Sequence, residues 1–313
     1  MKRYISLLFL LLSLAVSAQT GLFSKAYGDS KAPAVLFMHG GPGYNSANFE
    51  FSTAEELAKK GYYVIVYDER GCGRSKNYAP NADFSFKAQI KDVQDIYKKH
   101  GIKKATIIGH SWGGTLATKF ALAKPKMVEK IVFVGSPISY QMTFKNIIAR
   151  CQKIYGEKGD STNLSYVNIM ETSMDSTSLE YSSYCFLHAM TCGFYNTKVQ
   201  TLTSATFYKN IGNSTEKVDL IRQSEYAPVM GVYKQEKYTL LNLTADWLKL
   251  QKKGVKLFGM YGEEDGLFDA KQLDLISKTI GAGNVVVVKG ASHNVFIDKL
   301  DEFTRQFMLY QQK

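Results

Sequence analysis

The stretch TIIGHSWGGTLA (residues 106–117) runs from a β-branched segment into glycines that surround a single serine. It contains the pattern G-x-S-x-G, with Gly109 and Gly113 on either side of Ser111. This pattern also occurs by chance, and a small serine in a tight strand-to-helix connection would fit it equally well. The distinction depends on whether the rest of the chain supplies an acid, a base and an oxyanion site in a workable order.

The length and composition are those of an ordinary soluble globular protein. The 313 residues are 45% hydrophobic and 21% charged, enough for one large α/β domain with an insertion or for two modest domains. The net charge of +11 is spread along the chain, which argues against a nucleic-acid partner. We expect Cys72 to be free. Any single disulfide would join two of Cys151, Cys185 and Cys192, and the pairing stays open.

The chain begins with MKRYISLLFLLLSLAVSAQT, which has the organisation of a signal peptide. Lys2 and Arg3 precede an apolar run that is short for a bilayer, and small residues lead up to Ala18. We therefore expect residues 1–18 to be removed and the protein to be exported to the periplasm or the medium. An uncleaved membrane anchor is the alternative. No later apolar stretch is long enough to span a membrane, so no stable anchor is expected after cleavage.

Short runs rich in Val, Ile, Phe and Tyr recur along the chain with helical segments between them. They occupy residues 32–38, 62–68, 105–110, 130–136, 255–262 and 284–290. Continuous apolar runs are typical of strands that are buried on both faces of a parallel sheet. Helices are predicted from residue 86 to Gly101, with Ser85 as N-cap, and over residues 112–124 and 298–312. The alternation predicts a doubly wound, mostly parallel α/β sheet.

The alternation of predicted strands and helices is interrupted over residues 137–250, which are rich in aromatic residues and methionine and poor in β-branched runs. We interpret this segment as a mainly helical cap, inserted between two parts of the core, residues 19–136 and 251–313. Ligands of open α/β sheets bind at the carboxyl edge of the strands, so the cap is expected to shape the substrate pocket. An independent partner-binding domain is the alternative for this segment.

Ser111 lies between a predicted strand and a predicted helix, where a nucleophile elbow requires it. Gly109 and Gly113 let the backbone turn sharply, and the N-terminus of the following helix favours developing negative charge. These features favour Ser111 as a nucleophile over a structural serine.

A serine nucleophile needs a base and a carboxylate that orients the base, and on a doubly wound scaffold they follow in the order acid, then base. His293 is the only histidine beyond the insertion and follows a predicted strand, so we assign it as general base; a surface loop histidine is the alternative. Four acidic residues follow the predicted strand at residues 255–262: Glu263, Glu264, Asp265 and Asp269. Asp265 is the best acid, because a short carboxylate just past a strand end can reach a ring nitrogen. The two glutamates suit a turn or surface, and Asp269 suits a helix cap.

The motif HGGPG (residues 39–43) directly follows the first buried strand. The N–H of Gly41, together with that of Trp112, is suited to hold the oxyanion of a tetrahedral intermediate. Pro42 stiffens the turn, although a purely structural turn is the alternative. The residues expected to support the site are His39, Gly40, Pro42, Gly43, Gly109 and Gly113.

The motif DERGCGRS (residues 68–75) lacks the spacing of a phosphate-binding or dinucleotide-binding loop. We interpret it as a glycine loop behind the site, braced by Asp68 and Arg70. The chain has no H-E-x-x-H motif and no paired C-x-x-C motif, so neither a metal nor another cofactor is expected.

Three motifs of this chain resemble those of the proline iminopeptidase (prolyl aminopeptidase) family: HGGPG, DERGCGRS and GHSWGG. The members of this family are serine peptidases of the α/β-hydrolase superfamily. The resemblance covers residues 33–136 and 255–297 and implies the α/β-hydrolase fold. It also implies a triad of Ser111, Asp265 and His293, with Gly41 and Trp112 as oxyanion donors.

The resemblance does not extend to the cap, where the family's aminopeptidases place glutamates against the substrate's α-ammonium group. The corresponding stretch here, CFLHAMTCGFYN (residues 185–196), has no acidic residue. Four glutamates elsewhere in the cap could take the place of the family's ammonium-binding glutamates, and the choice among them stays open: Glu171, Glu180, Glu225 and Glu236. The expected function is an exported aminopeptidase that acts on short peptides through an acyl-enzyme. A carboxylesterase or other acyl hydrolase of small molecules with the same triad is the alternative, and a non-catalytic binding protein is a third reading. The oligomeric state stays open.

Overall fold

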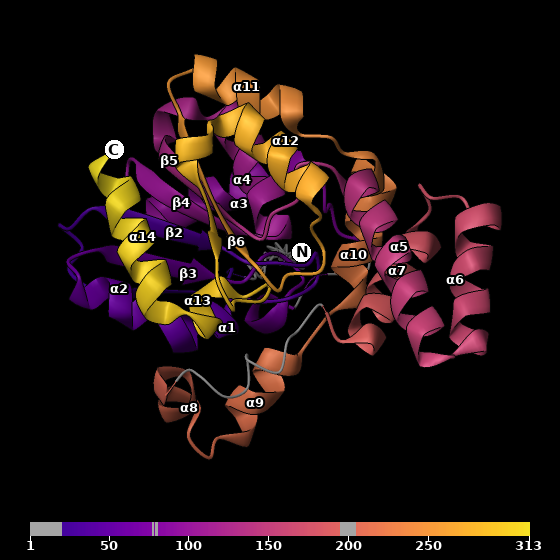
Figure 1. Ribbon diagram of the computed structural model, residues 1–313. Helices are drawn as coiled ribbons and strands as arrows, with labels where there is room; N and C mark the ends of the chain where they lie inside the picture. Colours follow the sequence, from indigo (N-terminus) through magenta and orange to yellow (C-terminus); the bar gives the residue numbers. More distant parts are fainter. Residues whose placement is uncertain (1–20, 77, 79–80, 195–204) are drawn as a thin grey trace, which may run out of the picture.

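The computed structural model of the protein describes residues 21–76, 78, 81–194 and 205–313 (Figure 1). The signal peptide expected over residues 1–18 lies outside the described residues. Within those described, no helix combines the length and the apolar character needed to cross a membrane.

A seven-stranded sheet forms the centre of the molecule, with the strand order β1-β3-β2-β4-β5-β6-β7. Its strands are β1 (Ser24–Tyr27), β2 (Ala34–Met38), β3 (Tyr63–Tyr67), β4 (Ala105–His110), β5 (Val128–Val134), β6 (Lys256–Gly262) and β7 (Val285–Val288). All neighbours pair in parallel except β1, which runs antiparallel to β3. The mostly parallel sheet is confirmed. The edge strand β1 was not predicted, because its four residues form no apolar run.

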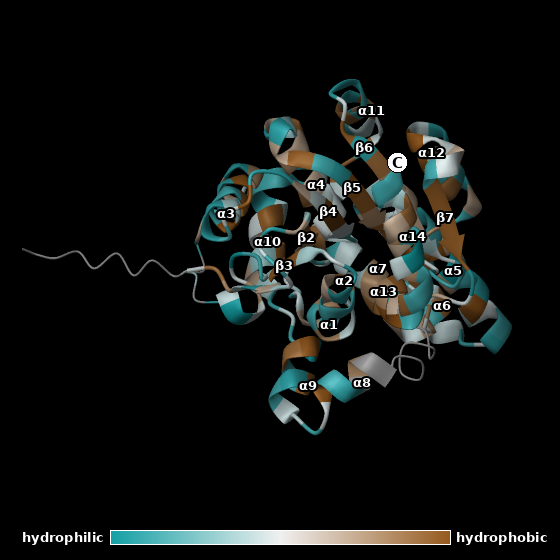
Figure 2. Ribbon diagram, turned by 90° about the vertical axis from the view of Figure 1, so that its left-hand side faces the viewer, coloured by the Kyte–Doolittle hydropathy of each residue, from teal (hydrophilic) through white to brown (hydrophobic). Residues whose placement is uncertain are grey.

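Helices cover both faces of the sheet, as Figure 1 shows. One layer contains α1 (Ala47–Phe49), α2 (Glu55–Lys59), α13 (Val295–Asp298) and α14 (Leu300–Gln312); the other contains α3 (Phe86–Lys99), α4 (Trp112–Ala123), α11 (Thr244–Lys252) and α12 (Ala270–Ile280). Along β2, Val35 and Phe37 enter the first core while Leu36 and Met38 enter the second. Because each strand buries both faces, its apolar residues run without alternation. In Figure 2 the strands are accordingly mostly brown.

The helix boundaries follow local signals in the sequence. The Ser85 side chain accepts a hydrogen bond from the Ala88 N–H at 3.3 Å and caps α3, as predicted. The same helix ends just before Gly101, whose φ of +67° suits glycine. The helix predicted over residues 298–312 is α14, which is preceded by the short α13.

The segment between β5 and β6 is helical and forms two groups (Figure 1). The first group contains α5 (Tyr140–Lys158), α6 (Ser161–Ser173) and α7 (Leu179–Cys192), which pack together, and α10 (Tyr226–Glu236), which lies between them and the sheet. The second group is a separate pair beside α1, formed by α8 (Ala205–Ile211) and α9 (Thr215–Arg222). The last helix, α11, belongs to the layer on the sheet. Its Trp247 stacks on Phe133 at 4.1 Å and donates its indole N–H to the Thr118 hydroxyl at 3.0 Å.

All four cysteines are free thiols in the structure. Cys72 is buried in the glycine loop, in agreement with the prediction that it is free. Cys151 and Cys185 are buried as well, on α5 and α7.

Candidate active site

Ser111 occupies a sharp turn between β4 and α4. Its backbone has φ 51° and ψ −119°, a conformation that a residue with a side chain rarely adopts. The Ser111 N–H donates to the Val134 carbonyl at 2.9 Å, and the Ser111 carbonyl accepts from the Gly114 N–H at 3.0 Å. The main chain on both sides of the serine is therefore held by neighbouring backbone, which maintains a strained conformation at the carboxyl edge of the sheet.

Close packing explains why both outer positions of the G-x-S-x-G pattern are glycine. A methyl group on Gly113 would lie 2.1 Å from the Met38 carbonyl oxygen at the end of β2. A methyl group on Gly109 would lie 2.6 Å from the Cα of Gly114. Neither backbone neighbour can move away cheaply, because each belongs to a paired strand or a helix. The turn therefore packs so closely against the sheet that both positions require glycine.

His293 and Asp265 form a hydrogen-bonded pair in the interior. The Nδ1 atom of His293 lies 2.7 Å from Oδ2 of Asp265, and the residues are 1% and 3% exposed. Asp265 follows β6 and His293 follows β7, so neighbouring parallel strands bring the two loops together. Gly135, with φ +54°, makes room for the ring, since a methyl group there would lie 2.9 Å from the same Nδ1.

The imidazole lies beside the turn that carries Ser111. The ring of His293 is 4.8 Å from the ring of His110, the residue directly before the serine. His110 also has a hydrogen bond to the loop of His293, whose carbonyl accepts from Nε2 at 3.2 Å. Burial holds the pKa of His110 well below its usual range, so this second imidazole is neutral.

Neighbouring carboxylates in the cluster after β6 have other partners. Asp269 caps α12 by accepting the Gln272 N–H at 2.8 Å, as predicted. Glu263 accepts the Gly290 N–H at 3.1 Å and braces the turn. Asp265 is the carboxylate of this cluster that is hydrogen-bonded to His293.

The HGGPG loop lies directly against Ser111. A methyl group on Gly40 would be 3.3 Å from the Cβ of Ser111. Gly41 and Gly43 have φ values of +139° and +97°, which favour glycine. Trp112 opens α4, so its N–H has no acceptor within the helix. The loop and the helix start thus bring the two expected oxyanion donors, Gly41 and Trp112, to the same turn.

His39 has a structural role in this loop. Its Nδ1 donates to the Gly40 carbonyl at 2.7 Å, and its Nε2 accepts the Glu69 N–H at 3.0 Å. Both nitrogens are thus used in a neutral ring that ties the loop to the end of β3. His39, Glu69 and Cys72 also lie close enough to hold a metal ion. The donor set does not fit one, because both ring nitrogens are used and burial raises the pKa of the Cys72 thiol well above its usual value.

Sequence reasoning missed Glu69 in the DERGCGRS loop. Its buried carboxylate accepts the indole N–H of Trp112 at 3.1 Å, and burial raises its pKa. It therefore fixes the side chain of the residue that supplies a candidate oxyanion N–H. The signal was a carboxylate directly after a buried strand.

The two residues expected to brace this loop, Asp68 and Arg70, bind separate partners. Arg70 forms a two-point contact with Asp92, at 2.6 and 2.7 Å. Asp68 binds Arg74, at 2.7 Å from the guanidinium Nε, and the Ser46 hydroxyl at 2.6 Å.

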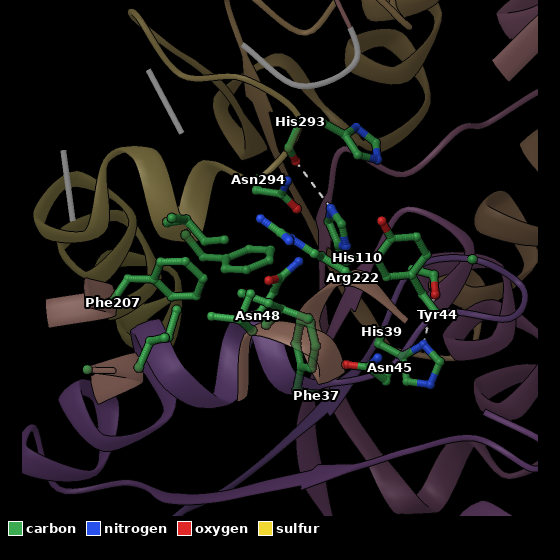
Figure 3. Close-up of a pocket in the computed structure, with 18 residues that line it drawn as sticks. Phe37, His39, Tyr44, Asn45, Asn48, His110, Phe207, Arg222, His293 and Asn294 are labelled. Carbon is green, nitrogen blue, oxygen red and sulfur yellow. Dashed lines mark hydrogen bonds between the residues drawn. The ribbon is translucent and has the colours of Figure 1, made fainter. Parts of the chain in front are cut away.

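A cavity of about 550 Å³ opens beside His293 (Figure 3). Its described lining includes Gly40 and Gly41 of the HGGPG loop and one cation. Apolar side chains from the sheet and from α8, α9 and α13 form the rest of the walls together with neutral polar residues. The apolar residues are Phe37, Phe207, Ile211, Val218, Ile221, Phe296 and Ile297, and the cation is Arg222. This volume is within the range of small-molecule sites.

The four candidate glutamates of the cap lie in different surroundings. Glu171 and Glu180 are exposed on α6 and α7, and the Glu236 carboxylate accepts the Phe86 N–H at 2.6 Å. Glu225 is partly buried, and its N–H donates to the Gly43 carbonyl at 2.8 Å. Of these four, Glu225 is the one whose main chain is bound to the HGGPG loop.

Comparisons with known proteins cover most of the chain. A sequence model of the family described as alpha/beta hydrolase fold matches residues 33–300. Epoxide hydrolase 4 of Mus musculus is 32% identical over 114 residues, 36% of this chain and 30% of that protein. A proline iminopeptidase of Thermoplasma volcanium is 22% identical over 294 residues, which cover 91% of this chain and 90% of that protein.

The fold has counterparts among solved structures. The crystal structure of a proline iminopeptidase-related protein from Thermus thermophilus has a TM-score of 0.63 at 18% identity and covers 91% of both chains. That likeness concerns the fold alone. Several curated relatives are matched only in part, since the chain spans about a third of their length.

Proposed function

The chain belongs to the alpha/beta hydrolase family, and from this premise we propose that it is a serine hydrolase acting through an acyl-enzyme. The observation that carries the proposal is the buried His293–Asp265 hydrogen bond of 2.7 Å beside the strained turn of Ser111. A buried carboxylate on Nδ1 holds the imidazole in the tautomer whose Nε2 accepts a proton.

In the proposed mechanism His293 takes the proton of the Ser111 hydroxyl as the oxygen attacks the substrate carbonyl. The N–H groups of Gly41 and Trp112 hold the oxyanion, and Asp265 stabilises the imidazolium. The imidazolium then protonates the leaving group. Water, activated by the same imidazole, releases the acyl group. Besides the substrate and water, every group in these steps is a side chain or backbone group of this chain.

We propose an aminopeptidase of the proline iminopeptidase type as the activity, with short peptides as substrates. The motifs HGGPG, DERGCGRS and GHSWGG support it, as does the similarity to a proline iminopeptidase over 91% of the chain. Glu225 is the candidate for binding the α-ammonium group, because its backbone is fixed on the oxyanion loop. We further propose export, on the evidence of the basic and apolar residues that begin the chain.

A specific observation favours an esterase as the second candidate. The described lining of the cavity beside His293 is largely apolar and contains no carboxylate, which suits the apolar group of an ester.

The test is a paired assay of the wild type and Ser111→Ala, with prolyl- and alanyl-naphthylamides beside p-nitrophenyl butyrate. We expect amide turnover that falls by about 10⁴-fold or more in the variant. Ester turnover alone, lost in the same way, would keep the triad and favour the esterase. Activity that survives the substitution would contradict the mechanism, and a folded wild type without any turnover would favour a binding protein.

A further inference from the structure

The cavity beside His293 has an unusual charge pattern. Within the part of the chain that the structure describes, Arg222 is its one Lys or Arg, and no Asp or Glu lines it. The remaining polar side chains are neutral amides, a tyrosine and the imidazoles. The described walls therefore offer no anionic partner for an ammonium group, and they offer one permanent cation to a ligand.

The backbone around Arg222 is anchored to the oxyanion loop. The Asn45 side-chain amide donates to the Leu220 carbonyl at 2.7 Å and to the Gln223 carbonyl at 3.4 Å. Two residues further on, the Glu225 N–H binds the Gly43 carbonyl. Arg222 is thus the last residue of α9, fixed on both sides to the loop that carries Gly41.

The side chain of Arg222 reaches into the cavity. In the view of Figure 3 it extends between the side chains of Asn294 and Asn48. None of the ion pairs among the described residues involves Arg222. A guanidinium is charged at every physiological pH, and its planar donors match the two oxygens of a carboxylate.

We propose that this cavity binds the leaving-group side of the substrate and that Arg222 pairs with a carboxylate at the end of that group. The inference rests on the proposed function, in which His293 protonates the leaving group, because His293 and Asn294 form one wall of the cavity. The substrate class is a short peptide with a free C-terminal carboxylate on the leaving-group side of the scissile bond. The apolar walls take the side chain of the departing residue.

The binding test uses the full-length protein and isothermal titration calorimetry, with 4-phenylbutyrate and its uncharged amide as probes. We expect wild type to bind the acid about 10-fold more tightly, a moderate factor because Arg222 is solvent-exposed. Arg222→Gln should bind both probes alike, and Arg222→Lys should retain part of the preference. Arg305→Gln removes the same charge from an exposed site outside the cavity and should bind like wild type.

The kinetic test compares a dipeptide with its C-terminal amide. The kcat/KM of wild type should favour the free acid, and Arg222→Gln should lose that preference mainly through KM. Equal affinity of wild type for the two calorimetric probes would overturn the inference, as would a preference that survives in Arg222→Gln. An Arg222-dependent preference in calorimetry without any peptide turnover would instead contradict the aminopeptidase and leave the anion site standing. A purely structural Arg222 would lower thermal stability without changing the ratio of the two affinities.

Discussion

The Nδ1 atom of His293 lies 2.7 Å from Oδ2 of Asp265, although 28 positions separate the two residues in the chain. The second oxygen of the same carboxylate accepts the Leu267 N–H at 3.1 Å, so the carboxylate is oriented by its own loop. The neighbouring loop is held as well, since the N–H and the hydroxyl of Ser292 both donate to Asp298. Each partner of the buried pair therefore has independent support.

Asp265→Asn should lower kcat by about 10⁴-fold, because an amide in this position favours the wrong tautomer of His293. The measurement is steady-state kinetics on the substrate that the paired assay identifies. Asp269→Asn is the matched control: the same substitution in the same cluster, at a helix N-cap that asparagine also satisfies. Near-normal activity of Asp265→Asn would exclude this carboxylate from the triad.

Gly113→Ala should lower the free energy of unfolding by about 3 kcal/mol, because the new methyl group would lie 2.1 Å from the Met38 carbonyl oxygen. Urea denaturation measures this loss, and the distorted turn should also reduce activity. Gly156→Ala is the control, since this glycine lies inside α5 with open space around it. That substitution should stabilise the protein by about 0.5–1 kcal/mol. Equal effects at the two positions would show that the turn is not tightly packed.

Glu225→Gln should raise KM for aminoacyl-naphthylamides by about 10-fold or more and leave ester hydrolysis unchanged, because an amide no longer attracts a substrate ammonium group. Glu171→Gln, an exposed position on α6, is the control and should change neither reaction. A parallel loss on esters and amides would instead indicate a structural role of the Glu225 carboxylate, which accepts a hydrogen bond from the Gln223 side-chain amide at 2.7 Å.

Arg74→Gln should destabilise the protein most at neutral pH. Burial alone raises the pKa of Asp68, but the hydrogen bonds and the charge of Arg74 outweigh it, so the pKa lies below the usual 3.8. Ionised Asp68 thus stabilises the fold above about pH 4, and this contribution disappears as the pH falls through the lowered value. Without the guanidinium the buried carboxylate is uncompensated, at a cost of about 3 kcal/mol at pH 7.

Urea denaturation at pH 7, 5 and 3 tests this prediction. The difference in the free energy of unfolding between wild type and Arg74→Gln should shrink towards pH 3. At that pH Asp68 is largely protonated in the variant, and its ion pair with Arg74 is weakening in wild type. Arg305→Gln, which breaks a solvent-exposed pair with Glu302, should leave the free energy of unfolding nearly unchanged at all three pH values. A difference that stays constant with pH would show that Arg74 acts through packing alone.

Most of the sheet was predictable because its signals are local. The strand predicted over residues 105–110 coincides with β4, and the strand predicted over 62–68 contains β3. The cap of α3 by Ser85 and the cap of α12 by Asp269 likewise depend on neighbours only three residues away. The edge strand β1 escaped prediction because it pairs with a strand far along the chain and has no apolar run of its own.

By itself, the sequence determined the six strands β2 to β7, the turn at Ser111 and the position of Asp265 and His293 after successive strands. These follow from hydrophobic periodicity, glycine geometry and the rule that parallel strands end at one edge. Only the tertiary structure decided that Glu69 binds the Trp112 indole, that the Glu225 backbone is bound to the HGGPG loop and that Arg222 lines the cavity. The Glu69–Trp112 contact joins two core loops 43 residues apart, and the contacts of Glu225 and of the segment around Arg222 depend on how the cap packs on the core, about 180 residues away in the sequence. No local pattern encodes either kind of contact.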